Sequence, residues 1–115
     1  MLQLKRPQTG KMKNILAEIV AHKHIEVAAK KQQRSIQELE QAPWFKRSAL
    51  SLCNFLQQPA KTGIIAEFKR RSPSKGVING NVTVQQVTTA YTRYGASGLS
   101  VLTDEKYFGG SVDDL

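Results

Sequence analysis

Apolar residues at helical spacing occupy the first part of the chain, and short apolar runs of strand length follow them. Over residues 13–33 apolar side chains recur three and four positions apart, which predicts an amphipathic helix with Asn14 as its cap. Ser35 and Glu38 fit the capping-box pattern, so a second short helix is expected over about 36–41. The chain is therefore expected to begin its regular structure with two consecutive helices.

A third helical stripe is expected over residues 46–58, and Pro59 ends it. Cys53 falls within this stripe and is interpreted as a small core residue. Residues 1–11 show no periodicity and contain both Pro and Gly, which indicates a disordered leader. The pattern thus predicts a leader over 1–11 and a helical N-terminal extension over 12–62.

Residues 63–115 alternate between strand and helix patterns. A strand is expected directly after Gly63, a helix over about 84–94 with Thr83 as its cap, and a second strand over 98–103. Strand, helix and strand in this order predict a βαβ unit with parallel strands and a right-handed crossover. The helix is expected to bury one stripe of side chains, namely Val84, Val87, Ala90, Tyr91 and Tyr94.

The connecting segments carry turn residues in place of a periodic pattern. Residues 70–82 and 104–110 are expected to be loops, and residues 111–114 resemble the cap and first turn of a further helix. Two parallel strands do not make a stable sheet by themselves. The pattern therefore predicts either that more chain once followed Leu115 or that the product is incomplete.

The first strand has one apolar face and one face that carries charge, because side chains alternate along a strand. The apolar face, which should lie under helices, consists of Ile64, Ala66 and Phe68. Glu67 and Lys69 share the opposite face at the carboxyl end of the strand, where charged groups of a β/α scaffold are typically functional. The alternative is a solvated ion pair on an edge strand, which contributes only about 0–1 kcal/mol and indicates no function.

The positive charge is concentrated near the N-terminus. The net charge is +8 over 115 residues, but residues 1–34 hold eight Lys or Arg against two Glu, whereas 35–115 hold nine against seven acidic residues. A basic nucleic-acid-binding module is one alternative that this excess suggests. No exposed aromatics alternate with the basic residues and no nucleic-acid-binding motif is present, so we expect no nucleic-acid partner.

Cysteine and histidine are sparse. Cys53 is the single cysteine, so no intramolecular disulfide is possible, and His22 and His24 do not share a helical face, so neither a metal site nor a cofactor is expected. A reducing, cytoplasmic compartment is the default for such a chain. No apolar run approaches the ~20 residues that span a bilayer, and no secretory signal is present, so no membrane partner is expected.

Two sequence strings resemble indole-3-glycerol phosphate synthase. They are IIAEFKRRSPSKG, beginning at residue 64, and ASGLSVLTDEKYFGGSVDDL, ending at residue 115. The resemblance starts near Met12, with KNILAEIVAHKHIEVAAKK similar to the N-terminal helix of the family. It implies an α/β fold, the N-terminal part of a TIM (β/α)8 barrel with a helical N-terminal extension, and a barrel that is incomplete in this chain.

The resemblance also implies an activity, that of a carbon-carbon lyase (carboxy-lyase) of tryptophan biosynthesis. The family closes the indole ring of 1-(2-carboxyphenylamino)-1-deoxyribulose 5-phosphate, a small phosphorylated substrate, with loss of carbon dioxide and water. By position, Glu67 corresponds to an active-site acid that binds or polarises the anilino nitrogen. Lys69 corresponds to an active-site lysine that faces the anionic groups of the substrate and supports proton transfer.

Further positions resemble substrate-binding residues of the family. They are Ser72, Pro73, Ser100, Leu102 and Phe108. Of these, Phe108 is expected to pack on the anthranilate ring. Arg70, Arg71 and Lys75 are expected to form a solvated, positively charged rim that steers the anionic substrate.

The family's principal general acid, a lysine on the third strand, lies beyond the residues present here, as do a later catalytic glutamate and the phosphate-binding loops. The chain alone is therefore expected to be inactive, and a non-catalytic remnant of the enzyme remains an alternative. The sequence leaves the oligomeric state open.

Overall fold

The computed structural model describes residues 14–115 and divides the chain between residues 46 and 47 into two compact units, each described here by itself. The expected leader, residues 1–11, lies outside the described residues. The predicted organisation into a leader, an extension over 12–62 and a βαβ unit over 63–115 stays a prediction.

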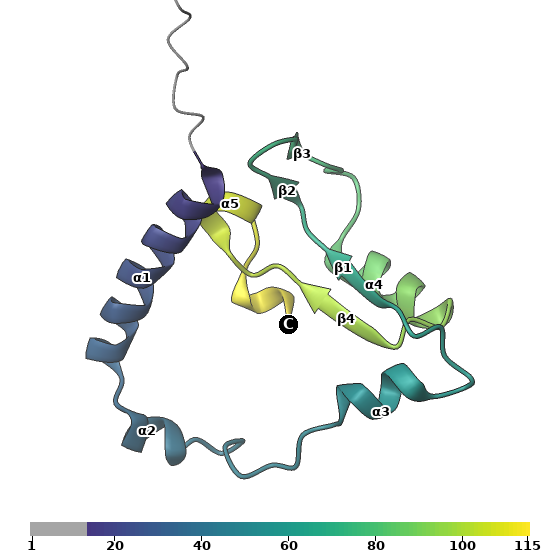
Figure 1. Cartoon of the computed structure of the whole chain (residues 1–115), viewed down its shortest axis with the longest axis horizontal. Helices are drawn as coiled ribbons and strands as arrows, with labels where there is room; N and C mark the ends of the chain where they lie inside the picture. Colours follow the sequence, from purple (N-terminus) through teal and green to yellow (C-terminus); the bar gives the residue numbers. More distant parts are fainter. Residues whose placement is uncertain (1–13) are drawn as a thin grey trace, which may run out of the picture. The chain divides into compact units, whose positions relative to one another are not determined.

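The first unit contains helices α1 (Ile15–Gln33), which the apolar spacing predicted, and α2 (Ile36–Glu40), which the capping-box pattern predicted (Figure 1). The Asn14 side chain caps α1 by accepting hydrogen bonds from two backbone N–H groups of the first turn. Ser35 and Glu38 form both hydrogen bonds of the capping box at the start of α2. Both predicted helix starts are therefore confirmed.

Helix α3 (Leu52–Gln57) opens the regular structure of the second unit and is shorter than predicted. The prediction of a helix from residue 46 is wrong, because Ser51 caps α3 by accepting a hydrogen bond from Asn54 N–H at 3.2 Å. The prediction that Cys53 is a core residue is also wrong, since Cys53 is exposed. Apolar spacing does not locate a cap, and it does not say which face is covered.

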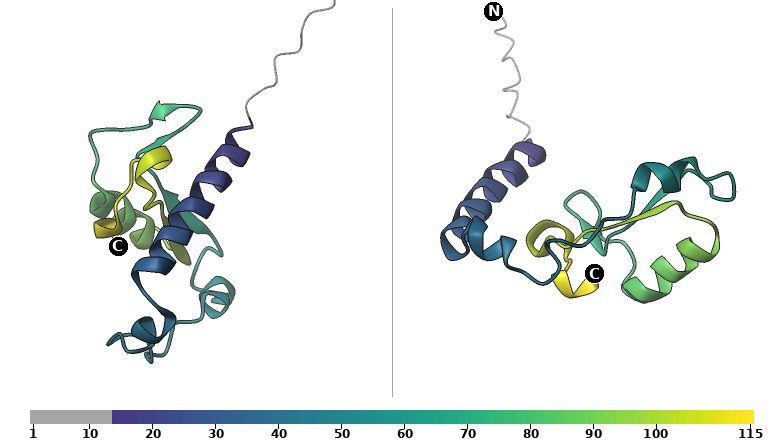
Figure 2. Two further views of the ribbon diagram at one scale, coloured as in Figure 1. Left: turned by 90° about the vertical axis from the view of Figure 1, so that its left-hand side faces the viewer. Right: turned by 90° about the horizontal axis from the view of Figure 1, so that it is seen from below.

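Strands β1 (Ile65–Phe68) and β4 (Gly98–Val101) form a parallel pair, as predicted. Helix α4 (Val84–Arg93) connects them in the chain and contacts β1, and Figure 2 shows it beside the two strands in two further views. Thr83 caps α4 and completes a capping box with Gln86. The fold of this unit is thus α/β, with a two-stranded parallel sheet and no closed barrel among the described residues.

The small core of the second unit surrounds the carboxyl end of β1. Phe68 is 6% exposed and Tyr107 is 7% exposed. The predicted buried stripe of α4 is wrong, because α4 has no buried residue: Val84, Val87 and Tyr91 are half-buried, and Ala90 and Tyr94 are exposed. Tyr94 follows Arg93, the last residue of α4, as its C-cap.

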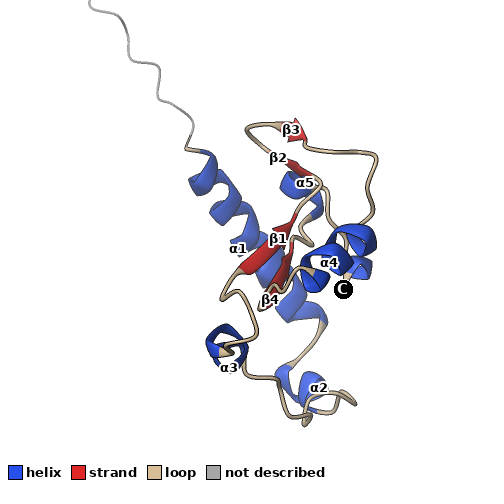
Figure 3. Cartoon of the chain, turned by 90° about the vertical axis from the view of Figure 1, so that its right-hand side faces the viewer, coloured by secondary structure: helices blue, strands red, loops and turns tan. Residues whose placement is uncertain are grey.

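Both predicted loops contain short regular elements, so the loop predictions are wrong at those positions. Strands β2 (Arg71–Ser72) and β3 (Gly76–Val77) form an antiparallel hairpin after β1, and Figure 3 shows it beyond the end of that strand. Helix α5 (Glu105–Phe108) follows β4, with the Asp104 carboxylate accepting a hydrogen bond from Tyr107 N–H. Elements of two to four residues are too short to show a hydrophobic period.

The chain ends in a 3-10 helix, η1 (Val112–Asp114), in agreement with the predicted helix start at Ser111. The Ser111 hydroxyl accepts a hydrogen bond from Asp113 N–H at 3.1 Å, and the Asp114 carboxylate accepts one from Ser111 N–H at 3.0 Å. Across the described residues, none of the helices combines the length and apolar character needed to cross a bilayer.

Candidate functional site

Glu67 and Lys69 lie at the carboxyl end of β1 with their side chains in contact. The Nζ atom of Lys69 is 3.1 Å from Oε1 of Glu67, as expected for residues two apart on one strand face. The side chains are 45% exposed for Glu67 and 38% for Lys69, so both groups remain open to a ligand. The geometry brings the predicted pair together, and its catalytic role stays a prediction.

The second strand adds two predicted residues to the same region. Ser100 is the register partner of Glu67 in the parallel pair, so the two side chains share one face of the sheet. Leu102 follows β4 and donates its N–H to the carbonyl of Phe68 at 3.0 Å, which extends the ladder by one residue. Both Ser100 and Leu102 are half-buried. The structure therefore places them next to the charged pair, while their contact with a substrate stays a prediction.

Ser72 and Pro73 belong to the β2–β3 hairpin. The Ser72 hydroxyl is 3.3 Å from the Ser74 hydroxyl and accepts a hydrogen bond from Lys75 N–H at 3.2 Å, so it closes the turn of the hairpin. Ser72 is half-buried and Pro73 is exposed. The structure thus gives Ser72 a local structural contact that the sequence strings do not reveal.

Phe108 is the last residue of α5 and is half-buried, next to the buried Tyr107. The helix ends at Gly109, which adopts a left-handed conformation with φ of 65°. This turn directs the chain back toward η1. Phe108 is therefore carried by a capped helical turn rather than by an irregular loop, and its packing on a substrate ring stays a prediction.

The predicted solvated rim of Arg70, Arg71 and Lys75 is only partly confirmed, because Arg71 and Lys75 are exposed and Arg70 is half-buried. The Arg70 guanidinium binds both carboxylate oxygens of Asp114, one of them at 2.7 Å. Arg71 donates to the carbonyl oxygens of Glu105 and Lys106, each at 2.8 Å. The predicted rim is therefore wrong for Arg70, whereas Arg71 is exposed and also has a partner far along the chain, and the steering of a substrate stays a prediction.

The electrostatics of Asp114 follow from these contacts. The hydrogen bond from the Arg70 guanidinium lowers the pKa of the Asp114 carboxyl, and the hydrogen bond from Ser111 N–H acts in the same direction. The same pairing raises the pKa of Arg70. The carboxylate at this position is therefore ionised and bound. Sequence reasoning missed this pair, because nothing in the local pattern links residues so far apart.

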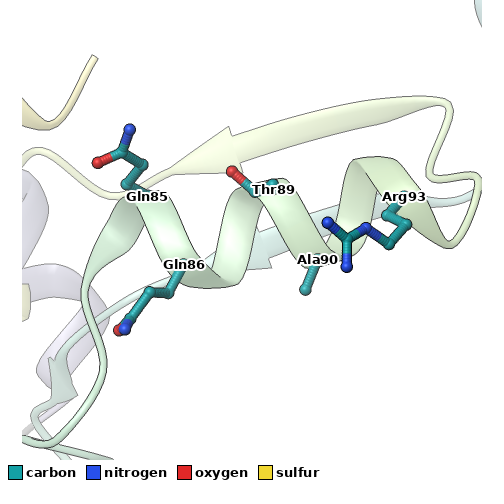
Figure 4. Close-up of a pocket in the computed structure, with 5 residues that line it drawn as sticks. All are labelled: Gln85, Gln86, Thr89, Ala90 and Arg93. Atoms are coloured by element: carbon teal, nitrogen blue, oxygen red, sulfur yellow. The ribbon is translucent and has the colours of Figure 1, made fainter.

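A surface depression on α4 lies apart from these residues. Its lining consists of Gln85, Gln86, Thr89, Ala90 and Arg93, all on α4 (Figure 4). None of them comes from a strand end, and no carboxylate lines it. Within residues 14–115, no group of three or more His, Cys, Asp or Glu residues is arranged to hold a metal ion.

Comparisons with known proteins agree on one family. The family model described as indole-3-glycerol phosphate synthase matches residues 16–115. The chain is 46% identical over 104 residues to the protein of that name from Bacteroides thetaiotaomicron, with 90% of this chain and 40% of the relative covered. It is 42% identical over 110 residues to the one from Prochlorococcus marinus, with 92% and 36% covered.

A third relative, the indole-3-glycerol phosphate synthase of Bordetella pertussis, is 39% identical over 107 residues, with 90% of this chain and 41% of the relative covered. The chain therefore spans about two fifths of the length of the curated relatives it matches.

Proposed function

The chain belongs to the indole-3-glycerol phosphate synthase family, and from this premise we propose that it supplies the N-terminal part of that enzyme's active site. The proposed reaction closes the indole ring of 1-(2-carboxyphenylamino)-1-deoxyribulose 5-phosphate and releases carbon dioxide and water. The observation that carries the proposal is the contact between Glu67 and Lys69 at the carboxyl end of β1.

The proposed architecture is a (β/α)8 barrel, of which β1, α4 and β4 form the first βαβ unit. The parallel register of β1 and β4 supports this, since parallel strands of a barrel alternate with helices. The charged pair would then lie at the carboxyl end of the barrel strands, where the active sites of such barrels are found. The chain covers 40% of the Bacteroides thetaiotaomicron relative, which agrees with an incomplete barrel.

Glu67 and Lys69 have complementary roles in the proposed chemistry. Ring closure requires an aromatic carbon to attack the sugar ketone, so negative charge develops on the ketone oxygen and electron density leaves the anilino nitrogen. The Glu67 carboxylate accepts a hydrogen bond from the anilino N–H and stabilises the positive charge that develops there. The Lys69 ammonium binds the anionic groups of the substrate and supports proton transfer to oxygen.

The remaining predicted residues would line the substrate pocket. The strand register that sets Ser100 beside Glu67 supports this role for Ser100 and Leu102. Ser72 and Pro73 would contact the substrate from the hairpin, and Phe108 would pack on its aromatic ring. We propose that the chain alone is inactive, because its charged pair is about half-exposed and such chemistry depends on a water-excluding site.

A hybrid protein tests this function. Residues 16–115 replace the matching segment of the Bacteroides thetaiotaomicron relative, which supplies the remainder of the barrel. We expect the hybrid to convert the substrate to indole-3-glycerol phosphate, measured by the fluorescence of the indole product. The unmodified relative and the 115-residue chain alone serve as positive and negative controls. A hybrid that melts cooperatively but forms no product would overturn the proposal.

A further inference from the structure

We propose that Arg70 and Asp114 act as a positioning pair, which fixes the segment carrying Lys69 against the segment that follows β4. This inference rests on the proposed function, and it assigns to two residues a role that neither the family match nor the sequence strings give them. Arg70 does not contact the substrate in this proposal. It acts through Lys69, its neighbour in the chain.

The contact between Arg70 and Asp114 has the geometry of a strong ion pair. Both terminal nitrogens of the guanidinium bind the carboxylate, one to each oxygen, which constrains orientation as well as distance. The Asp114 side chain is only 9% exposed, so the pair is shielded from solvent on the carboxylate side. The guanidinium carbon also lies 5.5 Å from the centre of the Phe68 ring, which limits the side chain further.

The backbone on both sides of Lys69 is held as well. Phe68 is buried, and its carbonyl accepts a hydrogen bond from Leu102 N–H at 3.0 Å. The carbonyl of Arg70 accepts a hydrogen bond from Ile78 N–H at 2.9 Å, which closes the base of the β2–β3 hairpin. Lys69 therefore lies between two residues, Phe68 and Arg70, whose backbone carbonyls are hydrogen-bonded. Of these contacts, the one between the Arg70 side chain and Asp114 joins the residues farthest apart in sequence.

The carboxylate partner is itself held in place. Asp114 accepts a hydrogen bond from Ser111 N–H in the capping box of η1, so its side chain is attached to its own helix. The low pKa of this carboxyl keeps it ionised at neutral pH. Arg70 thus binds a fixed charge.

Arg71 provides a second link between the same two segments. It donates to the carbonyls of Glu105 and Lys106 in α5, and the Glu105 carbonyl also accepts the N–H of Gly109 at 2.9 Å. Consecutive arginines after β1 therefore both bind the chain that follows β4. Lys69 is the residue before them, and its side chain turns the other way, toward Glu67. This division explains why Arg70 positions the site without entering it.

The test uses the hybrid protein with Arg70→Met and Asp114→Asn, singly and together. Arg93→Met and Asp113→Asn are matched controls, since they make the same changes on α4 and in η1. We expect each test variant to lower kcat by about 10- to 100-fold, because small misplacements of reacting groups have effects of this size. KM should change little, and the double variant should be no slower than the slower single variant, as expected for residues that act as one unit.

Three further measurements separate positioning from a general loss of structure. Active sites are counted by titration with a substrate analogue whose ketone is reduced, so that kcat refers to folded protein. Thermal melting reports stability. Amide hydrogen exchange of the peptide that contains Lys69 reports local order directly, and we expect it to rise in both test variants and to stay unchanged in the controls.

The outcomes distinguish this inference from the proposed function. An active hybrid whose Arg70→Met and Asp114→Asn variants turn over at the control rate overturns the positioning pair and leaves the proposed function intact. If the hybrid is folded but inactive, the proposed function fails, and amide hydrogen exchange then tests the positioning pair. Faster exchange of the Lys69 peptide in the test variants supports the pair, and unchanged exchange overturns it.

Discussion

Ser100 of β4 is the direct register partner of Glu67 of β1 in the parallel sheet. This pairing brings the two sequence strings that resemble the family into one place, because one string contributes Glu67 and the other contributes Ser100. The side chains of register partners lie on the same face of a sheet. The candidate site thus draws on both strands, and its charged residues are Glu67 in β1 and Lys69 directly after it.

Glu67→Gln and Lys69→Met in the hybrid protein should each lower turnover by about 10²- to 10⁴-fold, the range of a positioned acid or base. Stability should hardly change, since a solvent-exposed ion pair contributes about 0–1 kcal/mol. Steady-state kinetics and thermal melting measure both effects.

The matched controls are Glu26→Gln and Lys30→Met, which make the same substitutions in the ion pair of α1. They should leave turnover unchanged. Full activity in either the Glu67 or the Lys69 variant would remove that residue from the site.

Phe68→Ala should destabilise the hybrid by about 3–5 kcal/mol, because truncating a buried aromatic loses its burial and leaves a cavity. Phe68 is 6% exposed, whereas Tyr94 is 83% exposed. Tyr94→Ala is therefore the control and should change stability by no more than about 0.5 kcal/mol. Urea unfolding curves measure both, and equal effects would contradict the assignment of the core to the end of β1.

Gly110→Ala should destabilise the hybrid by about 1–3 kcal/mol or more, the usual effect of overpacking. A Cβ atom on Gly110 would lie 1.9 Å from the Leu102 carbonyl oxygen, so the backbone would have to move. Gly80→Ala is the control, since its nearest neighbour would be Val77 Cγ1 at 4.0 Å. A Gly110→Ala variant as stable as the Gly80→Ala variant in urea would show that this close approach is absent.

Glu26 should titrate far below the ordinary value of a glutamate, because hydrogen bonds from Lys23 and Lys30 lower its pKa from 4.5 to about 2. A lowered carboxyl pKa stabilises the folded state above the unfolded pKa, and this contribution is lost as pH falls from 4.5 through about 2. NMR titration of the side-chain carboxyl carbon measures the value. Lys30→Met should move it upward, and an unmoved pKa would exclude this ion pair as the cause.

The 115-residue chain alone should not melt cooperatively as a monomer. Its parallel sheet has two strands, each with one unpaired edge, and such edges promote association. Circular dichroism during heating, together with size-exclusion chromatography, tests this. A sharp transition from a monomeric species would show that the two strands and their helices suffice for a stable core.

Local signals predicted the helices and strands well where a capping residue and its partner are near each other in the sequence, or where apolar and polar residues alternate. Asn14, Ser35, Thr83 and Ser111 each accept the backbone hydrogen bond that their position suggested. Such caps involve residues two or three apart, so the sequence itself contains both partners. The start of α3 was missed because the apolar stripe continues ahead of Ser51, where no helix forms.

The exposure of single residues was harder to predict. Cys53 and Tyr94 lie in apolar stripes and are nevertheless exposed, because burial requires a second element to cover the stripe. The same limit applies to the pairing of Arg70 with Asp114, which are far apart in sequence. The charge of an arginine shows that the side chain needs either an acidic partner or water. It does not identify the partner residue.

The sequence by itself determined the capped helices, the parallel strand order, the single face shared by Glu67 and Lys69, and the family, since each depends on neighbouring residues or on contiguous strings. Only the tertiary structure decided that Ser100 lies beside Glu67 and that Arg70 and Arg71 bind the segment after β4. Those contacts join positions that meet only after the strands have paired, because register and loop closure are set by packing across the whole unit.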